Sequence, residues 1–292
     1  MASQTPAWTL AGQKGISTSL NHRDLAIALG KFNLTIKDNI VPASDGAGVV
    51  EADPDLVSTW TGLCGGHGVY HETSLVKMPD NLSFDEAATL TCSGLTAWNS
   101  LFGLQGRKPK KGSVVLVQGT GGVSIAALQF ALASGATVIA TTSNDAKASK
   151  LKSLGAHHVI NYKTTPDWGT TAKGFTLDGR GVDLIVDVGA ASTLPQSLKA
   201  IRPEGVIALA GLLGGASSPD MPSLMDGLSY LCTSRGLLLG TRVQFHAMNQ
   251  FIEENDIRPV LDEKVFDLYQ VREAYEYLEQ QKHFSKVVVR VC

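Results

Sequence analysis

A β-branched run that stops at three glycines restricts the fold of this chain more than any other feature. Residues 112–124 read Gly-Ser-Val-Val-Leu-Val-Gln-Gly-Thr-Gly-Gly-Val-Ser, and an apolar helical pattern follows them. A strand, a glycine turn and a helix in this order form the part of a βαβ unit whose first helical N–H groups face the pyrophosphate of a dinucleotide. We therefore expect strands at Val114–Gln118 and Thr137–Thr141, with a helix at Ser124–Ser134 between them.

The spacing of the glycines predicts a structural role for Gly119 and another for Gly121. Gly119 permits the tight turn after the strand, Gly121 lets the backbone approach the pyrophosphate, and the helix opens after it. Ser124 departs from the usual pattern, because Gly or Ala is common at that sixth position. The alternative is an ordinary glycine-rich turn that binds no ligand. The predicted dinucleotide contacts of the turn are Gly119, Thr120, Gly121, Gly122 and Val123.

The end of the second strand favours NADPH over NADH. An NAD site usually has Asp or Glu there to accept the ribose 2′-hydroxyl, whereas this strand ends Thr141-Thr142-Ser143-Asn144 and the first acid is Asp145. Ser143, Lys147 and Tyr162 are the residues that we expect around a 2′-phosphate. The alternative is that Ser143 only caps the next helix and that Lys147 is a solvated surface charge.

Further apolar strands alternate with helical segments along the chain. We expect them at 158–161, 183–188, 205–210 and 236–240, which predicts a six-stranded parallel sheet covered by helices on both faces. Ligands of such sheets bind at the carboxyl ends of the strands. Small residues there are equally explained by turn geometry alone. The predicted cofactor contacts in these turns are Gly189, Gly211, Leu212, Gly240 and Arg242.

The composition is that of an ordinary globular protein with more than one domain. The chain has 292 residues, of which 43% are hydrophobic, and a formal net charge of −2 without a basic cluster, so we expect no nucleic-acid partner. We also expect no membrane association and a cytoplasmic location, because neither a targeting signal nor a long apolar segment is present. The four cysteines form no CxxC pair, which argues against a disulfide framework or a zinc knuckle.

Five motifs in order resemble the medium-chain dehydrogenase/reductase superfamily, and within it the zinc-type alcohol dehydrogenase-like proteins and quinone oxidoreductases. The motifs lie at 20–25, 42–50, 75–98, 118–124 and 283–288. The resemblance implies an α/β fold: a Rossmann doubly wound parallel sheet at 96–248, and a GroES-like, β-rich catalytic domain at 1–95 to which residues 249–292 return. It also implies a homodimer formed by joining cofactor sheets edge to edge, for which the apolar segment Leu237–Leu239 is suitable.

The same resemblance allows the zinc ligands to be checked one by one. Zinc-dependent members use Cys, His and Cys, and the matching residues here are Asn21, Ser44 and Cys92. One thiol cannot hold Zn²⁺, which needs three protein ligands and an open position, and the four-cysteine structural-zinc segment is missing as well. We therefore expect no metal. Cys92 is then a buried small apolar residue in preference to a nucleophile.

Without zinc, the resemblance favours hydride transfer to an enone or quinone, with polar groups that stabilise the charge developing on oxygen. Asn21 is the first candidate to orient the substrate carbonyl or the nicotinamide. His22, where relatives usually carry Tyr, has three open roles: a donor to the enolate, a contact to the pyrophosphate, or a surface residue. Asp24 and Asp45 are expected to be structural hydrogen-bond acceptors. The predicted catalytic group is Asn21, His22, Ser44, Cys92 and Thr96.

The N-terminal part is shorter than the resemblance requires. Thr9–Ser19 reads as a Gly- and Ser-containing linker where relatives have a hydrophobic strand, and few residues separate Val50 from Gly65, so we expect a truncated catalytic domain. Two functions follow. The first is an NADPH-dependent oxidoreductase acting on an enone, quinone or carbonyl of a small apolar molecule, with a biosynthetic role and a detoxifying role both open. The second is an auxiliary or binding protein, or a nonredox enzyme, on a degenerate dehydrogenase scaffold.

Overall fold

The computed structural model describes residues 7–10, 17–29, 43–48, 50–52 and 68–291. These residues form two compact units, which we call the central unit (Thr96–Gly240) and the terminal unit (the described residues of Met1–Leu95 and Thr241–Cys292). Helix α9 (Arg242–Glu254) belongs entirely to the terminal unit. The boundary expected at residue 248 therefore lies inside a helix, and the chain leaves the central unit at Gly240 instead.

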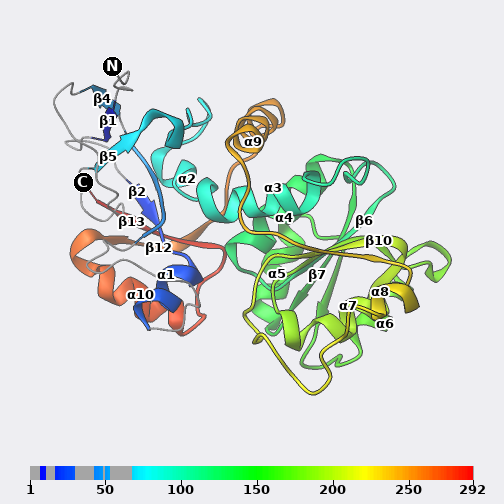
Figure 1. Ribbon diagram of the computed structural model, residues 1–292. Coiled ribbons are helices and arrows are strands. Elements are labelled where there is room, and N and C mark those ends of the chain that lie inside the picture. The colour runs from blue at the N-terminus through cyan, green and yellow to red at the C-terminus, as the bar shows by residue number, and fades with distance from the viewer. Residues whose placement is uncertain (1–6, 11–16, 30–42, 49, 53–67, 292) are drawn as a thin grey trace. The chain divides into compact units, whose positions relative to one another are not determined.

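The central unit is built on a six-stranded, all-parallel sheet with the order β11-β10-β9-β6-β7-β8. Counted along the chain, this is the doubly wound order 3-2-1-4-5-6 read from the β8 edge, which confirms the Rossmann prediction. The direction of winding changes between β6 and β9, at the centre of the sheet. Figure 1 labels three strands of this sheet, β6, β7 and β10. The strands are β6 (Val114–Gln118), β7 (Thr137–Thr142), β8 (His158–Asn161), β9 (Val182–Asp187), β10 (Ile201–Leu209) and β11 (Thr233–Gly236).

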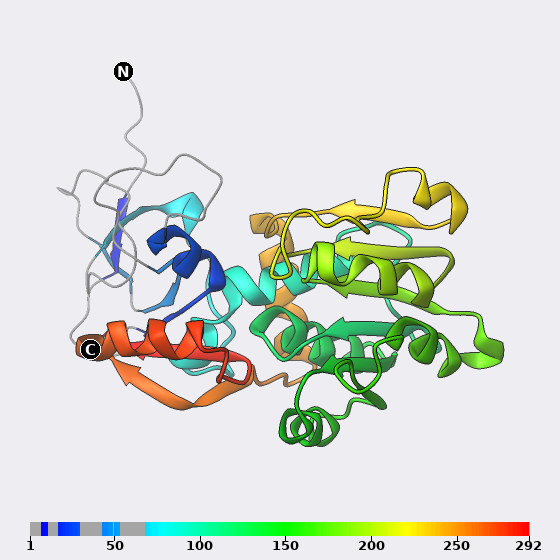
Figure 2. The same ribbon diagram turned by 90° about the horizontal axis from the view of Figure 1, so that it is seen from below.

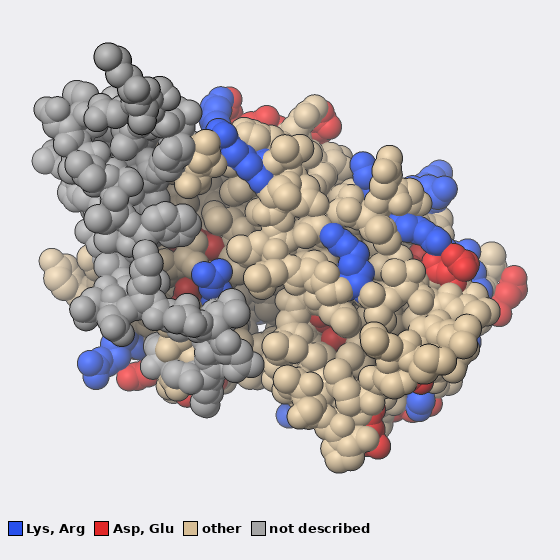
Figure 3. All heavy atoms as spheres, viewed as in Figure 1, with Lys and Arg blue, Asp and Glu red and all other residues tan. Residues whose placement is uncertain are grey.

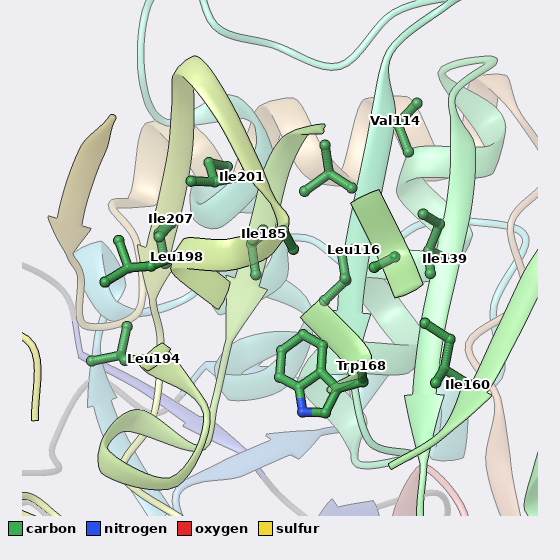
Figure 4. Close-up of a cluster of buried hydrophobic side chains, with 13 residues drawn as sticks. Val114, Leu116, Ile139, Ile160, Trp168, Ile185, Leu194, Leu198, Ile201 and Ile207 are labelled. Carbon is green, nitrogen blue, oxygen red and sulfur yellow. The ribbon is translucent and has the colours of Figure 1, made fainter. Parts of the chain in front are cut away.

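Helices cover both faces of this sheet (Figure 2). The apolar side chains Leu116, Ile139 and Ile185 pack with Trp168 and Leu198 on one face (Figure 4). Residues between them in the strands point the other way and are buried as well, which explains the continuous apolar strand sequences. The helices are α3 (Leu95–Phe102), α4 (Gly122–Ala133), α5 (Asp145–Ser153), α6 (Trp168–Gly174), α7 (Leu194–Ala200) and α8 (Asp226–Ser229), with short turns η4 (Leu177–Gly179) and η5 (Ala190–Ser192).

The last strand of the sheet differs from its prediction at 236–240. β11 ends at Gly236, although the Leu237 N–H still donates to the Leu209 carbonyl at 3.2 Å. Leu239 has a φ of 56°, in the left-handed region that an extended strand cannot include. The apolar residues expected to form the strand therefore follow it as an irregular segment.

The terminal unit contains two small sheets. The three-stranded sheet β4-β1-β5 is antiparallel, and the four-stranded sheet β12-β13-β2-β3 joins both ends of the chain. The strands are β1 (Ala7–Leu10), β2 (Ser17–Ser19), β3 (Asp45–Ala47), β4 (Val50–Ala52), β5 (Gly68–His71), β12 (Leu261–Asp267) and β13 (Lys286–Arg290). The linker expected at Thr9–Ser19 is thus wrong at both its ends, which lie in β1 and β2. The shortening expected between Val50 and Gly65 falls largely outside the described residues.

The helical elements of the terminal unit pack on these sheets. Phe266 and Val287 form a buried core with Leu20, Ala274 and Leu278. The elements are α1 (His22–Ala28), η2 (Glu72–Ser74), α2 (Phe84–Ala87), the π-helical turn η3 (Leu90–Gly94), α9, η6 (Leu268–Gln270) and α10 (Val271–Glu279).

The surface carries both signs of charge. On the face shown in Figure 3, basic and acidic side chains of the described residues are dispersed among neutral ones. Among the described residues, no helix is long and apolar enough to cross a membrane.

Candidate active site

The glycine turn lies at the carboxyl end of β6, next to the point where the winding of the sheet reverses. Gly119 has a φ of 75°, and its N–H donates to the Thr141 carbonyl at 2.9 Å. Thr120 is buried, Gly121 is the extended N-cap of α4, and Gly122 begins the helix. α4 therefore presents its free N–H groups at the position where parallel sheets of this kind bind phosphate.

Two kinds of glycine can be distinguished at the carboxyl ends of the central strands. A Cβ atom at Gly119 or Gly121 would meet no protein atom within 4 Å. A Cβ at Gly211 would lie 2.8 Å from the Val188 carbonyl oxygen, and one at Gly189 would lie 2.5 Å from the Thr193 side chain. Packing within the protein explains Gly189 and Gly211, whereas the space at Gly121 is left open, as the approach of a dinucleotide requires.

Ser124 has a structural explanation. Its side chain is buried in the first turn of α4, and its hydroxyl donates to the Gln118 carbonyl at 2.5 Å. The hydroxyl closes the turn from strand to helix and satisfies a buried polar group. The departure from Gly or Ala at this position is thus compatible with the dinucleotide turn.

No acidic side chain stands at the end of β7, where an NAD site usually has the Asp or Glu that accepts from the ribose 2′-hydroxyl. Asn144, and not Ser143, caps α5, since its Oδ1 accepts from the backbone N–H groups of Ala146 and Lys147. The alternative assignment of Ser143 as the cap is therefore wrong. The Asp145 carboxylate accepts from Asn161 Nδ2 at 2.8 Å. Ser143 and Lys147 are half-buried.

The remaining predicted cofactor residues are spread over several elements. Tyr162 follows β8 and is exposed, and Leu212 is exposed in the segment after β10. Gly240 is the last residue of the central unit, and Arg242 is an exposed residue at the start of α9 in the terminal unit.

The terminal unit contains a buried polar cluster around Asn21, which we call the Asn21 cluster: Ser19, Asn21, Asp24, Ser44, Asp45, Ser93 and Lys286. Asn21 Nδ2 donates to Asp45 Oδ2 at 2.9 Å and lies 3.5 Å from Ser44 Oγ. Its Oδ1 accepts from Lys286 Nζ at 2.6 Å and from Ser93 Oγ at 3.3 Å. All the hydrogen-bonding capacity of the Asn21 side chain is thus used within the protein.

Lys286 brings a buried cation into this cluster. The residue is 4% exposed, and Nζ also donates to the Leu20 carbonyl at 2.8 Å and lies 3.6 Å from Asp45 Oδ2. A buried ammonium is stable only when it is paired and hydrogen-bonded. β13 supplies Lys286 and β3 supplies Asp45, so the four-stranded sheet sets the position of the pair.

The two acids of the cluster are hydrogen-bond acceptors, as expected. Asp24 accepts from the Asn21 backbone N–H and from the Ser44 hydroxyl, both at 2.9 Å. Burial raises the pKa of Asp24, and the Asp45 carboxylate raises it further, against these two hydrogen bonds, which lower it. Asp45 Oδ2 also accepts from the Ser19 hydroxyl, whereas its Oδ1 is buried without a hydrogen-bond partner among the described residues.

Cys92 lies in η3 and is not set up as a nucleophile. Burial raises the pKa of its thiol to about 12, with a further contribution from the Asp45 carboxylate. Such a thiol is protonated at neutral pH and is inert. Thr96 is buried in α3, in the central unit, where its carbonyl accepts from the Ser100 hydroxyl. His22 is exposed at the start of α1, and Ser44 is half-buried.

A zinc ion does not fit these residues. At the three positions that match the ligands, Asn21 is saturated by hydrogen bonds and Ser44 donates to Asp24, which leaves Cys92 as a single thiol where zinc needs three protein ligands. The ammonium of Lys286 contacts the Asn21 oxygen that a metal would need. Among the residues that the structure describes, no group of three His, Cys, Asp or Glu side chains is arranged to hold a metal ion.

Comparison with known proteins identifies the family. The zinc-type alcohol dehydrogenase-like protein of Schizosaccharomyces pombe is 39% identical over 94% of this chain and 89% of its own length. The chain belongs to the medium-chain dehydrogenase/reductase superfamily. A family model described as zinc-binding dehydrogenase matches residues 122–254 of this superfamily member.

Two solved structures extend the likeness over the whole chain. The structure of an NAD-dependent alcohol dehydrogenase is 27% identical in sequence and has a TM-score of 0.86. The match covers 98% of the chain described here and 92% of the alcohol dehydrogenase chain. The CurK enoyl reductase is also 27% identical, with a TM-score of 0.79 and coverages of 99% and 93%. The protein is thus an NAD(P)-dependent oxidoreductase of the medium-chain type, which favours the first of the two expected functions over an auxiliary role.

The inertness of Cys92 is testable by alkylation. At pH 8, a pKa of about 12 in place of the usual 9.0 lowers the thiolate fraction by about a thousandfold. We expect Cys92 to resist iodoacetamide in the native protein and to react rapidly in urea, measured by peptide mass spectrometry. Cys92 is half-buried, so fast native labelling would contradict a protonated, inert thiol.

Proposed function

We propose that this chain is a zinc-independent, NADPH-dependent oxidoreductase that reduces an enone, quinone or carbonyl group of a small apolar molecule. The observation that carries the proposal is the hydrogen bond from the Lys286 ammonium to Asn21, at a position where zinc-dependent relatives have a ligand. The Lys286 ammonium lies 3.6 Å from Asp45 Oδ2 and Asn21 donates to the same oxygen, so a cation of the protein itself pairs with this buried carboxylate. The enoyl reductase relative supports reduction of a conjugated double bond.

The glycine turn and α4 would hold the dinucleotide. The N–H groups from Gly121 to Val123 would bind the pyrophosphate, and Ser143 and Lys147 would contact a 2′-phosphate. When bound, NADPH supplies a hydride to the unsaturated carbon of the substrate. The Asp145 carboxylate accepts from Asn161 Nδ2 at 2.8 Å, which fixes the side chain of this first acid after β7.

The proton and the stabilisation of the developing oxygen charge would come from the terminal unit. Ser44 is the first donor candidate: its half-buried hydroxyl donates to Asp24 here and would have to turn from that carboxylate to the substrate oxygen. His22, exposed at the start of α1, is the second. Asn21 is a support in this proposal and not a substrate contact, since its amide is fully occupied.

Cofactor preference is tested by titration with NADPH and NADH, followed by nicotinamide fluorescence. We expect saturable binding with a preference for NADPH, and Lys147→Ala should weaken NADPH binding by about tenfold with little effect on NADH, because one charge-assisted contact is lost. Lys152→Ala, on the exposed face of the same helix, is the matched control. Equal loss for both nucleotides would refute the 2′-phosphate contact.

Zinc independence is tested by metal analysis of the purified protein. We expect no stoichiometric zinc before or after dialysis against a chelator. Lys286→Met should lower the free energy of unfolding by about 3–5 kcal/mol, because Asp45 stays buried without its cation. Lys282→Met is the control, since Lys282 is exposed. One tightly held zinc per chain would overturn the proposal.

We also propose that two copies of the chain pair through the β11 edge of the central sheet. β11 is an edge strand, and the segment around it exposes a set of large apolar side chains that water would otherwise solvate. Hydrogen bonds from Asn99 to the Leu239 carbonyl and from Arg235 to Asn99 fix this edge to α3. The exposed apolar residues are Leu212, Leu213, Met221, Leu224, Met225, Leu228, Tyr230, Leu231 and Leu238.

Light scattering after gel filtration tests the pairing. We expect a particle of twice the 30.9 kDa chain mass. Leu238→Glu should convert it to a monomer, whereas Leu177→Glu should not, although both leucines are almost equally exposed, at 78% and 77%. A wild-type monomer at micromolar concentration would refute this interface.

A further inference from the structure

A buried carboxylate in the central unit has no part in the site described so far. Asp187 ends β9 and is 0% exposed. Its Oδ1 accepts from the Gly189 and Ala190 N–H groups at 3.2 and 2.9 Å and from the Thr193 hydroxyl at 2.7 Å. Each of these donors belongs to the loop that follows β9, so one oxygen of Asp187 fixes that loop.

The second oxygen of Asp187 faces the glycine turn. Asp187 Oδ2 accepts from Gln118 Nε2 at 3.0 Å and from Ser197 Oγ at 2.7 Å. Gln118 is buried at the end of β6, immediately before Gly119, and its Oε1 accepts from the Val188 N–H at 3.3 Å. Gln118 and Asp187 therefore connect the two strand ends between which the winding reverses.

The loop after β9 needs such support. Ala190 has a φ of 50°, in the left-handed region that a non-glycine residue occupies at a cost. The Ala190 N–H is held by Asp187, and its carbonyl accepts from the Thr193 N–H at 3.0 Å. A strained backbone that is held by a buried acid at a ligand-binding crevice points to a role in shaping that crevice.

Each hydrogen bond around Asp187 and Gln118 has a fixed donor and a fixed acceptor. None of the hydrogen-bond partners of Asp187 among the described residues is a cation, so five neutral donors stabilise the carboxylate. The Gln118 amide is correspondingly fixed, because its NH₂ must face Asp187 and its oxygen must face the Val188 N–H. Gln118 Nε2 also donates to Ser197 Oγ at 2.8 Å. Exchanging the acid and the amide between the two positions reverses the bonds that join them and, with the Ser197 hydroxyl turned round, still pairs each donor with an acceptor. Changing either residue alone leaves like groups facing each other.

We propose that Asp187 and Gln118 are positioning residues for the dinucleotide: together they hold the glycine turn after β6 and the loop after β9 at the separation that the bound cofactor requires. Neither side chain needs to contact the dinucleotide. This role rests on the proposed binding of a dinucleotide by the central unit and is independent of the preference for NADPH over NADH.

The test compares Asp187→Asn, Gln118→Glu and the exchanged double variant. Asp187→Asn would place a new NH₂ group against the Gln118 NH₂, and Gln118→Glu would place a second carboxylate against Asp187. Each single variant should raise the Kd for NADPH by at least about tenfold. In the double variant, the new carboxylate at position 118 accepts from the new amide at position 187 and from the Val188 N–H. Binding should then recover to within about threefold of wild type.

Asp183→Asn is the matched control, because Asp183 lies at the opposite end of the same strand. Its carboxylate accepts from the Val114 N–H and pairs with Arg180 and Arg202. Asp183→Asn should lower the Tm and leave the Kd of the folded protein unchanged. A double variant that binds as poorly as the single variants, or single variants with lowered Tm and unchanged Kd, would overturn the proposal.

The titrations are done with both NADPH and NADH. Tighter binding of NADH by wild type would contradict the proposed cofactor preference, while the pattern across the variants would still test the positioning role. Absence of binding of either nucleotide to wild type would overturn both.

Discussion

The reversal of winding between β6 and β9 is the constraint on which the rest of the structure depends. The connections that follow two such neighbouring strands run to opposite sides of the sheet. In sheets of this kind the ligand binds at this point, outside the carboxyl ends of the strands. Here Gly119 and Gly121 leave that space free, Ser124 closes the turn, and Gln118 joins Asp187 across the two strand ends. Backbone and side-chain hydrogen bonds thus hold the two strand ends at the position where sheets of this kind bind a dinucleotide.

The terminal unit buries several polar side chains within a small β-rich unit. Removing Asn21, Asp45 and Lys286 from water is unfavourable for each side chain, and their mutual hydrogen bonds offset the loss. The arrangement uses an internal ammonium in the region where zinc-dependent relatives place a metal. Ser44 remains the half-buried polar group at the edge of this cluster, which accounts for the choice of this residue in the proposed chemistry.

Local signals predicted the central unit well and the terminal unit poorly. Glycines, β-branched runs and helix starts act over a few residues, so the parallel sheet with its alternating helices was predicted from the sequence, and the Rossmann fold from the family resemblance. Leu239 shows the limit, because its left-handed backbone ends a strand that its apolar character favours. Lys286 and Asn21 are 265 residues apart, and Gln118 and Asp187 are 69 apart, so no local pattern joins them. The local sign for the role that we propose for Asp187 is an acid at the end of a buried strand.

One measurement tests directly whether this oxidoreductase catalyses its reaction without a metal. Single-turnover loss of NADPH absorbance is followed with a panel of enones and quinones, using protein that has been stripped with a strong chelator and assayed in its presence. If catalysis needs no zinc, turnover is unchanged by the chelator and by added Zn²⁺. Activity that disappears on stripping and returns only with Zn²⁺ would contradict metal-independent catalysis.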